Sequence, residues 1–116
     1  MEAEYMSLAA ATQQAVFLRA LLGEFGILRE LEPTRIHEDN QACIKFGSDP
    51  VGHSRAKHID IKYHFVREKI ISNEIRLDYC HTNEMIADAL TKPITANQFE
   101  SLVRMMGMRT LADFAN

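Results

Sequence analysis

Apolar residues recur at three- and four-residue steps from Glu2 to Leu22, which is the period of an amphipathic helix. The stripe predicted to face the core consists of Leu8, Ala11, Ala15, Leu18 and Leu22. Gly23 and Gly26 predict the end of this helix, because glycine readily adopts the left-handed backbone conformation found just after many helices. A long helix is therefore expected to open the chain.

The middle of the chain alternates between strand and helix patterns. A short strand is predicted at Arg35–Glu38, followed at once by a helix at Gln41–Phe46. A second helix at Lys57–Ser72 leads to the alternating strand Ile75–Cys80. The core stripe of that second helix is predicted to be Ile59, Tyr63, Val66 and Ile70. Two strands joined through helices predict a right-handed parallel crossover.

Helical patterns return after the second strand. Thr82 is the predicted N-cap of a helix at Glu84–Thr91. Thr95 and Gln98 have the spacing of a capping box and open a last helix that ends at Gly107. The apolar side of the last helix is Phe99, Leu102, Val103 and Met106. We therefore expect one domain over residues 1–107 and a tail over residues 108–116.

Composition keeps this chain in an ordinary globular class. Its 116 residues allow one domain, and 47% of them are apolar and 25% charged. No apolar run approaches the roughly 20 residues of a membrane span, and the first residues lack a basic-then-apolar signal. A soluble intracellular protein without membrane contact is expected. Cys43 and Cys80 lack the close pairing of a metal knuckle, so they are predicted to be core thiols.

Basic residues are concentrated between His53 and Lys69, although the net charge is −3. The cations of this segment are Arg55, Lys57, Lys62, Arg67 and Lys69. A basic stripe can follow a phosphate backbone, and a solvated helix face is an equally good interpretation. A zinc site formed by His53, His58 and His64 is disfavoured, because spacings of five and six residues do not share one helical face.

Three carboxylates stand out by position: Glu4 early in a helix, Asp39 at a strand tip and Asp88 in a late helix. Ligands of open α/β sheets bind beyond the carboxyl ends of the strands, which places Asp39 at such a crevice. Carboxylates from separate elements repel one another unless a cation lies between them, and their oxygens suit magnesium. Glu4 has a simpler alternative, since an acid in the first turn complements the helix dipole at an exposed end.

Four ordered blocks of sequence carry a family resemblance. EAEYMSLAAATQQAVFLRALL, EDNQACI, HSRAKHIDIKYHFVRE and ADALTKP resemble the ribonuclease H domain that ends the reverse transcriptase region of copia-type retrotransposon polyproteins. The resemblance covers about Glu2 to Met106. It implies a ribonuclease H-like fold and cleavage of the RNA strand of RNA–DNA hybrids with Mg²⁺, or alternatively Mn²⁺. The family's acids fall on Glu4, Asp39 and Asp88, as catalytic residues and metal ligands.

The resemblance also implies partners. Contact with the RNA–DNA hybrid is expected from Asn40, Gln41, Arg55, Lys57 and His58. The upstream reverse transcriptase region of the polyprotein is a second expected partner. His81 lies near the place where related enzymes carry a mobile histidine, but this loop is short and we interpret His81 as a loop residue. The location is expected to be cytoplasmic or nuclear, or a virus-like particle if the element is intact.

The chain departs from the family at its beginning. A ribonuclease H-like domain normally begins with three strands, the first of which supplies another catalytic aspartate. The predicted fold class is accordingly α/β, a ribonuclease H-like fold that lacks its first three strands and keeps two parallel strands with about five helices. Weak magnesium binding and little nuclease activity are expected, with self-association through the bare edge of Arg35–Glu38 as one outcome. The alternative is a non-catalytic remnant that acts as a helical protein-interaction module.

Overall fold

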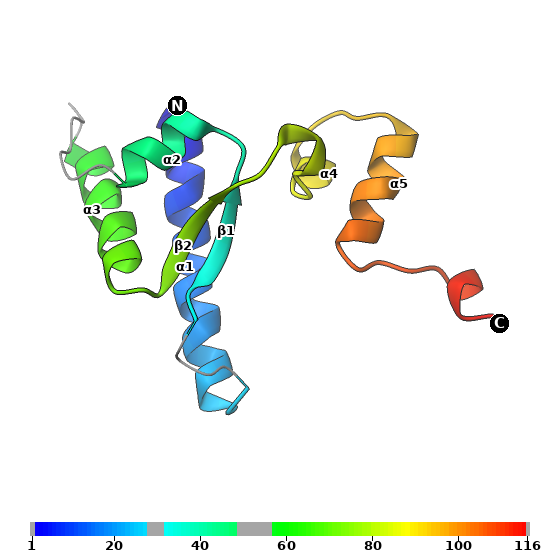
Figure 1. Ribbon diagram of the computed structural model, residues 1–116, viewed down its shortest axis with the longest axis horizontal. Helices are drawn as coiled ribbons and strands as arrows, with labels where there is room; N and C mark the ends of the chain where they lie inside the picture. Colours follow the sequence, from blue (N-terminus) through cyan, green and yellow to red (C-terminus); the bar gives the residue numbers. More distant parts are fainter. Residues whose placement is uncertain (1, 28–31, 49–56, 116) are drawn as a thin grey trace. The chain divides into compact units, whose positions relative to one another are not determined.

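The computed structural model describes residues 2–27, 32–48 and 57–115 of the chain (Figure 1). The α-helices are α1 (Glu2–Glu24), α2 (Gln41–Ser48), α3 (Lys57–Ile71), α4 (Asp88–Thr91) and α5 (Ala96–Met105). The strands are β1 (Thr34–Glu38) and β2 (Ile75–Tyr79), and the 3₁₀ turns are η1 (Thr82–Glu84) and η2 (Leu111–Phe114). The chain divides into two compact units, residues 1–79 and 80–116, which we describe separately.

The strands β1 and β2 of the first unit form a parallel pair, as predicted. The register places Thr34 opposite Ile75 and Glu38 opposite Tyr79. The backbone amide of Thr34 also donates to the carbonyl of Glu74 at 3.0 Å, which extends the pairing by one residue. Among the residues described, the structure is α/β with five α-helices and a two-stranded parallel sheet. The predicted boundary of the domain at residue 107 stays a prediction.

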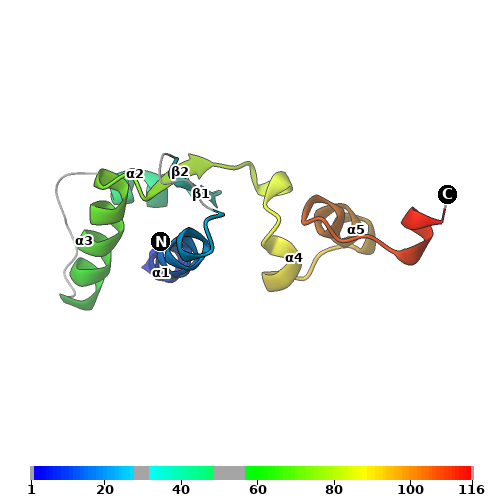
Figure 2. The ribbon, with the colours of Figure 1, turned by 90° about the horizontal axis from the view of Figure 1, so that it is seen from below.

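A single core lies between the inner face of the sheet and the helices α1, α2 and α3. The predicted stripe of α3 is confirmed, because Ile59, Tyr63 and Val66 are buried. Figure 2 shows α1 beneath the two strands, with α3 beside it. The thiol of Cys43 is fully buried in this core, whereas Cys80 is half-buried.

The predicted buried stripe of α1 is confirmed at Leu8 and Ala15 and is wrong at Ala11 and Leu18. The residues that α1 buries are Tyr5, Leu8, Ala9, Thr12 and Ala15. Ala11 and Leu18, which the pattern assigned to the core, are exposed. Apolar side chains occur nearly all round this helix, so its periodicity does not select one face. Thr12 can be buried because its hydroxyl donates to the carbonyl of Leu8 at 2.8 Å.

Gly26, rather than Gly23, terminates α1. Gly26 has a φ of 72°, and its amide donates to the carbonyl of Gly23 at 3.0 Å. The amide of Ile27 donates to the carbonyl of Leu22 at 2.9 Å. These two bonds form the Schellman arrangement, in which a left-handed residue satisfies the last carbonyls of a helix. Gly23 is an ordinary helical residue one turn earlier.

The second unit differs from the prediction at its start. The predicted helix Glu84–Thr91 is replaced by η1 and the short α4, separated by an extended Met85 with ψ of 99°. The predicted cap residue Thr82 lies inside η1. The cap is His81 instead, whose Nδ1 accepts from the amide of Asn83 at 3.3 Å.

The predicted N-cap of the last helix is confirmed, and the return bond from the side chain of Gln98 that would complete a capping box stays a prediction. The hydroxyl of Thr95 accepts from the amide of Gln98 at 3.2 Å, and Gly107 has a φ of 96° just beyond the end of α5. After α5, η2 carries a capping box between Thr110 and Asp113. No helix in the parts of the chain that the structure describes is long and apolar enough to cross a membrane.

Candidate functional site at the carboxyl end of β1

Helix α1 runs antiparallel to β1 and is tied to it at two places. Near the amino end of β1, Nη1 of Arg19 donates to the carbonyl of Glu32 at 2.8 Å and to the hydroxyl of Thr34 at 3.0 Å. Just past the carboxyl end, Nδ2 of Asn40 donates to a carboxylate oxygen of Glu4. From Glu4 to Arg19 the helix advances by fifteen residue steps, or about 22 Å. From Thr34 to Asn40 the chain advances by six steps, or about 20 Å if extended, so the two contacts are about equally far apart on α1 and along β1.

Asn40 is the centre of the hydrogen bonds at this end of the sheet. Its Oδ1 accepts from the amide of Cys43 at 3.0 Å, which makes Asn40 the N-cap of α2. Its own amide donates to Oε1 of Glu38 at 3.0 Å, while its Nδ2 holds Glu4. Through its side chain and its backbone amide, Asn40 therefore joins the start of α1, the end of β1 and the start of α2. The predicted site residues Glu4 and Asp39 are brought to the same end of the first unit by this arrangement.

Glu38 adds a third carboxylate to this end of the unit. Burial raises the pKa of Glu38 above 4.5, and the negative charges of Asp39 and Glu4 raise this pKa further. The hydrogen bond from the amide of Asn40 acts in the opposite direction but does not cancel these effects. The carboxyl end of β1 is therefore a place where negative charges lie close enough to penalise one another.

Two ionisable side chains in the apolar core near these carboxylates, Cys43 and Tyr5, keep their protons at neutral pH. Burial raises the pKa of the Cys43 thiol to about 12, and the nearby charges of Glu38 and Glu4 add to the shift. Burial likewise raises the pKa of Tyr5 far above its ordinary value of 10. The rings of Tyr5 and Tyr63 stack with centroids 6.2 Å apart. Neither Cys43 nor Tyr5 is therefore an ionised nucleophile at neutral pH.

Asp88 belongs to the second unit. It is the first residue of α4 and is buried, and Nζ of Lys92 lies 3.1 Å from its Oδ1. Lys92, the C-cap residue just after α4, thus compensates the charge of a carboxylate that is largely removed from water.

The carboxylates fit a magnesium ion only in part. Across the part of the chain that the structure describes, no group of three or more His, Cys, Asp or Glu side chains lies close enough to hold a metal ion. Magnesium is commonly held through one or two carboxylates and keeps several water molecules, with substrate phosphates as further ligands. Glu4 and Asp39 supply two carboxylates at the same end of the first unit, and a metal site formed by them or by the predicted set of three stays a prediction.

Of the residues expected to contact nucleic acid, the structure describes the side chains of Asn40 and Gln41. Arg55 lies outside the described residues, as does His53, and Lys57 and His58 open α3 without described side chains. Gln41 is exposed at the first position of α2, and Asn40 is half-buried among its hydrogen bonds to Glu4, Glu38 and Cys43.

Glu38 is the residue at this end of the sheet that the sequence analysis did not select as a site residue. Its signal was the alternation of β1, which places Thr34, Ile36 and Glu38 on the face toward the helices.

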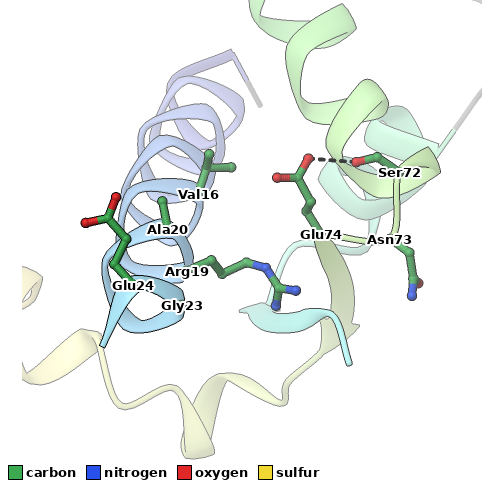
Figure 3. Close-up of a pocket in the computed structure, with 8 residues that line it drawn as sticks. All are labelled: Val16, Arg19, Ala20, Gly23, Glu24, Ser72, Asn73 and Glu74. Atoms are coloured by element: carbon green, nitrogen blue, oxygen red, sulfur yellow. Dashed lines mark hydrogen bonds between the residues drawn. The ribbon is translucent and has the colours of Figure 1, made fainter. Parts of the chain in front are cut away.

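A cavity of about 620 Å³ lies at the opposite end of the first unit (Figure 3). Its lining residues are Val16, Arg19, Ala20, Gly23, Glu24, Ser72, Asn73 and Glu74. Arg19 is occupied by its bonds to Glu32 and Thr34, and Glu74 accepts from Ser72 at 2.8 Å and pairs with Lys69 at 3.0 Å. These groups connect α1, β1 and the α3–β2 turn. Because ligands of parallel sheets bind beyond the carboxyl ends, this cavity is not the candidate site.

Similarity to known proteins points to retroelements. The curated relatives of the chain are retrovirus-related Pol polyproteins from transposons, with 33 to 37% identity over most of the chain. This similarity supports a retroelement polyprotein region as the class to which the chain is related. No protein-family model matches the chain, and no solved structure matches it significantly.

The particular relatives come from two plants. The polyprotein of transposon RE1 from Arabidopsis thaliana is 37% identical over 92% of the chain, and that of transposon RE2 from the same plant is 36% identical over 92%. The polyprotein of transposon TNT 1-94 from Nicotiana tabacum is 33% identical over 94% of the chain. The chain spans only 7 to 8% of the length of these relatives.

Proposed function

We propose that the chain is the part of a retroelement ribonuclease H module that carries its acidic metal ligands. Its activity is metal-dependent endonucleolytic cleavage of the RNA strand of RNA–DNA hybrids, in association with the reverse transcriptase region of the polyprotein. The observation that carries the proposal is the placement of Glu4 beside the Asp39–Asn40 tip of β1, from a helix far away in the sequence. The similarity to Pol polyproteins supports the same reading.

Each side chain has a defined task in this proposal. Glu4 and Asp39 are ligands of a divalent ion, Mg²⁺ or alternatively Mn²⁺, with Asp88 as the third acid. Such an ion, when bound, activates a water molecule and stabilises the leaving oxygen of a phosphodiester. Asn40 orients Glu4 and keeps the start of α2 in place beneath it. Glu38 contributes negative charge next to Asp39, which favours a cation at this position.

The first test is metal binding measured by thermal unfolding. Mg²⁺ binds the folded chain in this proposal and therefore raises its melting temperature, by an amount that grows with the ion concentration. Asp39→Asn removes a ligand charge and abolishes the rise. Glu100→Gln, which alters an exposed acid on α5, leaves it intact. Equal responses of Asp39→Asn and the unaltered chain would contradict the assignment of Asp39.

The second test is cleavage of a hybrid with a labelled RNA strand. Any cleavage that requires Mg²⁺ or Mn²⁺ is expected to be lost in Asp39→Asn and kept in Glu100→Gln. Cleavage that persists in Asp39→Asn would exclude these carboxylates as its source. A metal-dependent rise in melting temperature without cleavage would assign the ligands to this chain and the remaining chemistry to the rest of the polyprotein.

A non-catalytic interaction module is the second candidate. The observation in its favour is that each unit by itself exposes large apolar side chains: Phe17, Leu18 and Phe25 in and just after α1, and separately Phe99, Met105 and Met106 in and just after α5. Exposed apolar side chains in a group often mark a protein-binding surface. The magnesium experiment separates the two candidates, because an interaction module without a metal site gains no stability from the ion.

A further inference from the structure

The face of the sheet turned away from the core carries a group of charged side chains. In β1, Arg35 and His37 are exposed and alternate with the inward residues. In β2, Arg76 and Asp78 are directly opposite them, because the register pairs Arg35 with Arg76 and His37 with Asp78. We call these four residues the outer sheet face. It lies on the strands themselves, whereas Asp39 follows the last residue of β1 and Glu4 belongs to α1.

Both arginines of the outer sheet face converge on one oxygen atom. Nη2 and Nε of Arg76 donate to Oδ2 of Asp78 at 2.9 and 3.2 Å, and Nε of Arg35 lies 3.7 Å from the same Oδ2. Two guanidinium groups on neighbouring strands can therefore approach a single oxyanion at once. Asp78 already occupies one side of that position.

The ion pairs with Asp78 leave one net positive charge on this face and several N–H donors of Arg35 and Arg76 open to water. The side chains of Arg35 and Arg76 are 62% and 46% exposed, against 31% for Asp78. Among the residues that the structure describes, Asp78 is the partner of both arginines. Each guanidinium group has five N–H donors and one positive charge. The single carboxylate of Asp78 therefore cannot accept from all the donors of both arginines or cancel both of their charges. Like charges directly opposite one another on neighbouring strands destabilise a sheet, so the arrangement favours an added anion.

We propose that the outer sheet face binds a phosphodiester group of a nucleic-acid backbone, held jointly by Arg35 and Arg76. Arginine binds phosphate oxygens through its planar fork of donors, and a phosphate contact needs charge without sequence recognition. An acidic protein partner is the less favoured ligand, because interface arginines act as anchors in well-packed pockets with aromatic neighbours, and the four residues of this face include no aromatic anchor such as Trp or Tyr. The face is a local basic area on a chain of net charge −3.

This contact is separate from hydrolysis and is testable without it. Binding to a phosphate through arginine needs no metal, so a labelled RNA–DNA hybrid can be titrated with the full 116-residue chain in EDTA. Failure of catalysis leaves this binding intact, and failure of this binding leaves the metal ligands of the proposed function untouched. The logarithm of the association constant is then measured against the logarithm of the salt concentration.

The arginine variants have a defined expected result. Each neutralised phosphate contributes about 0.9 to the salt slope. Arg35→Gln combined with Arg76→Gln is therefore expected to reduce the slope by about one, because both arginines share one phosphate. Arg104→Gln is the matched control, since Arg104 is 58% exposed and pairs with Asp113 at 3.3 Å in the same manner. This control is expected to keep the slope of the unaltered chain.

Asp78→Asn gives a result of opposite sign. Removing the carboxylate raises the charge of the face by one and frees the donors of both arginines, so hybrid affinity is expected to rise by about two- to fivefold at low salt. A purely structural network predicts no gain from this change. Unchanged affinity and slope in the arginine double variant, or weaker binding by Asp78→Asn, overturns the proposal. Arginine-dependent binding of polyglutamate without binding of the hybrid overturns it in favour of an acidic protein partner.

Discussion

Glu38 shows how the fold changes the chemistry of a single residue. Glu38 is the last of the inward-facing residues of β1, after Thr34 and Ile36. Its carboxylate therefore occupies a position at which the alternation of the strand predicts a core residue. Burial and the charges of Asp39 and Glu4 raise its pKa, which means that folding favours the protonated form. A raised carboxyl pKa lowers stability as the pH rises from the unfolded-state pKa, near 4.5, through the higher folded-state pKa.

Replacing Glu38 by glutamine removes this penalty. Glu38→Gln keeps an acceptor for the amide of Asn40 but carries no charge. Its free energy of unfolding relative to the unaltered chain is therefore expected to increase as the pH rises above 4.5. Urea unfolding between pH 4 and pH 7 measures the difference. A difference that does not change with pH would contradict the raised pKa.

Glu74→Gln is the matched comparison at the other end of the sheet. The hydrogen bond from Ser72 and the charge of Lys69 lower the pKa of Glu74 below 4.5. The stabilising effect of Glu74 is present above its unfolded-state pKa and is lost as the pH falls through the folded-state pKa. Glu74→Gln is accordingly expected to cost stability at pH 7 and progressively less toward pH 3. The two variants thus respond to pH in opposite directions.

At the scale of elements, two glycines of the same helix have different roles. Gly26 has a φ of 72°, whereas Gly23 has an ordinary helical backbone, and a Cβ added at either position meets no atom within 4 Å. Gly26→Ala is therefore expected to cost about 1 kcal/mol from left-handed backbone strain alone. Gly23→Ala is expected to stabilise by about 0.5–1 kcal/mol. Equal effects of the two changes on urea unfolding would contradict the observed helix end.

The start of α2 depends on Asn40 in two ways. Asn40→Ala removes the acceptor of the Cys43 amide and the donor to Glu4, so a loss of about 1 kcal/mol is expected from the cap. Asn40→Asp keeps a capping oxygen but places a further charge beside Glu4 and Glu38. Thermal unfolding at pH 7 is expected to show a loss for both variants. At pH 3, where the raised pKa of Glu38 leaves that carboxyl protonated, the loss from Asn40→Asp is expected to be smaller.

At the scale of the whole molecule, the first unit rests on one small core. Leu8 is 2% exposed and Leu18 is 49% exposed, although both belong to the apolar pattern of α1. Leu8→Ala is expected to cost about 2–5 kcal/mol, because it leaves a cavity. Leu18→Ala is expected to stay within about 0.5 kcal/mol of the unaltered chain. Since small domains are stabilised by only about 5–15 kcal/mol, urea unfolding readily separates these outcomes. Similar losses from both would contradict the orientation of α1.

Local chemistry made much of the fold predictable from sequence. The periodicity of α3 identified Ile59, Tyr63 and Val66 as core residues, and the alternation of Ile75–Tyr79 identified a strand. Thr95 and Gly107 marked the two ends of α5. These features depend on neighbours within a few residues, so the residues themselves carry the signal. Glu4, Asp39 and Asp88 were selected as candidate site residues by position and by family resemblance in the same way.

Tertiary structure decided the features that depend on distant residues. The buried face of α1 could not be predicted from sequence because apolar residues surround that helix, and only α3 and the sheet select one side. The bond between Asn40 and Glu4 joins residues far apart in sequence. The register that places Arg35 opposite Arg76 is likewise set by packing. The sequence by itself determined which elements form, and packing determined which side chains meet, because a single element has no information about its partner's position.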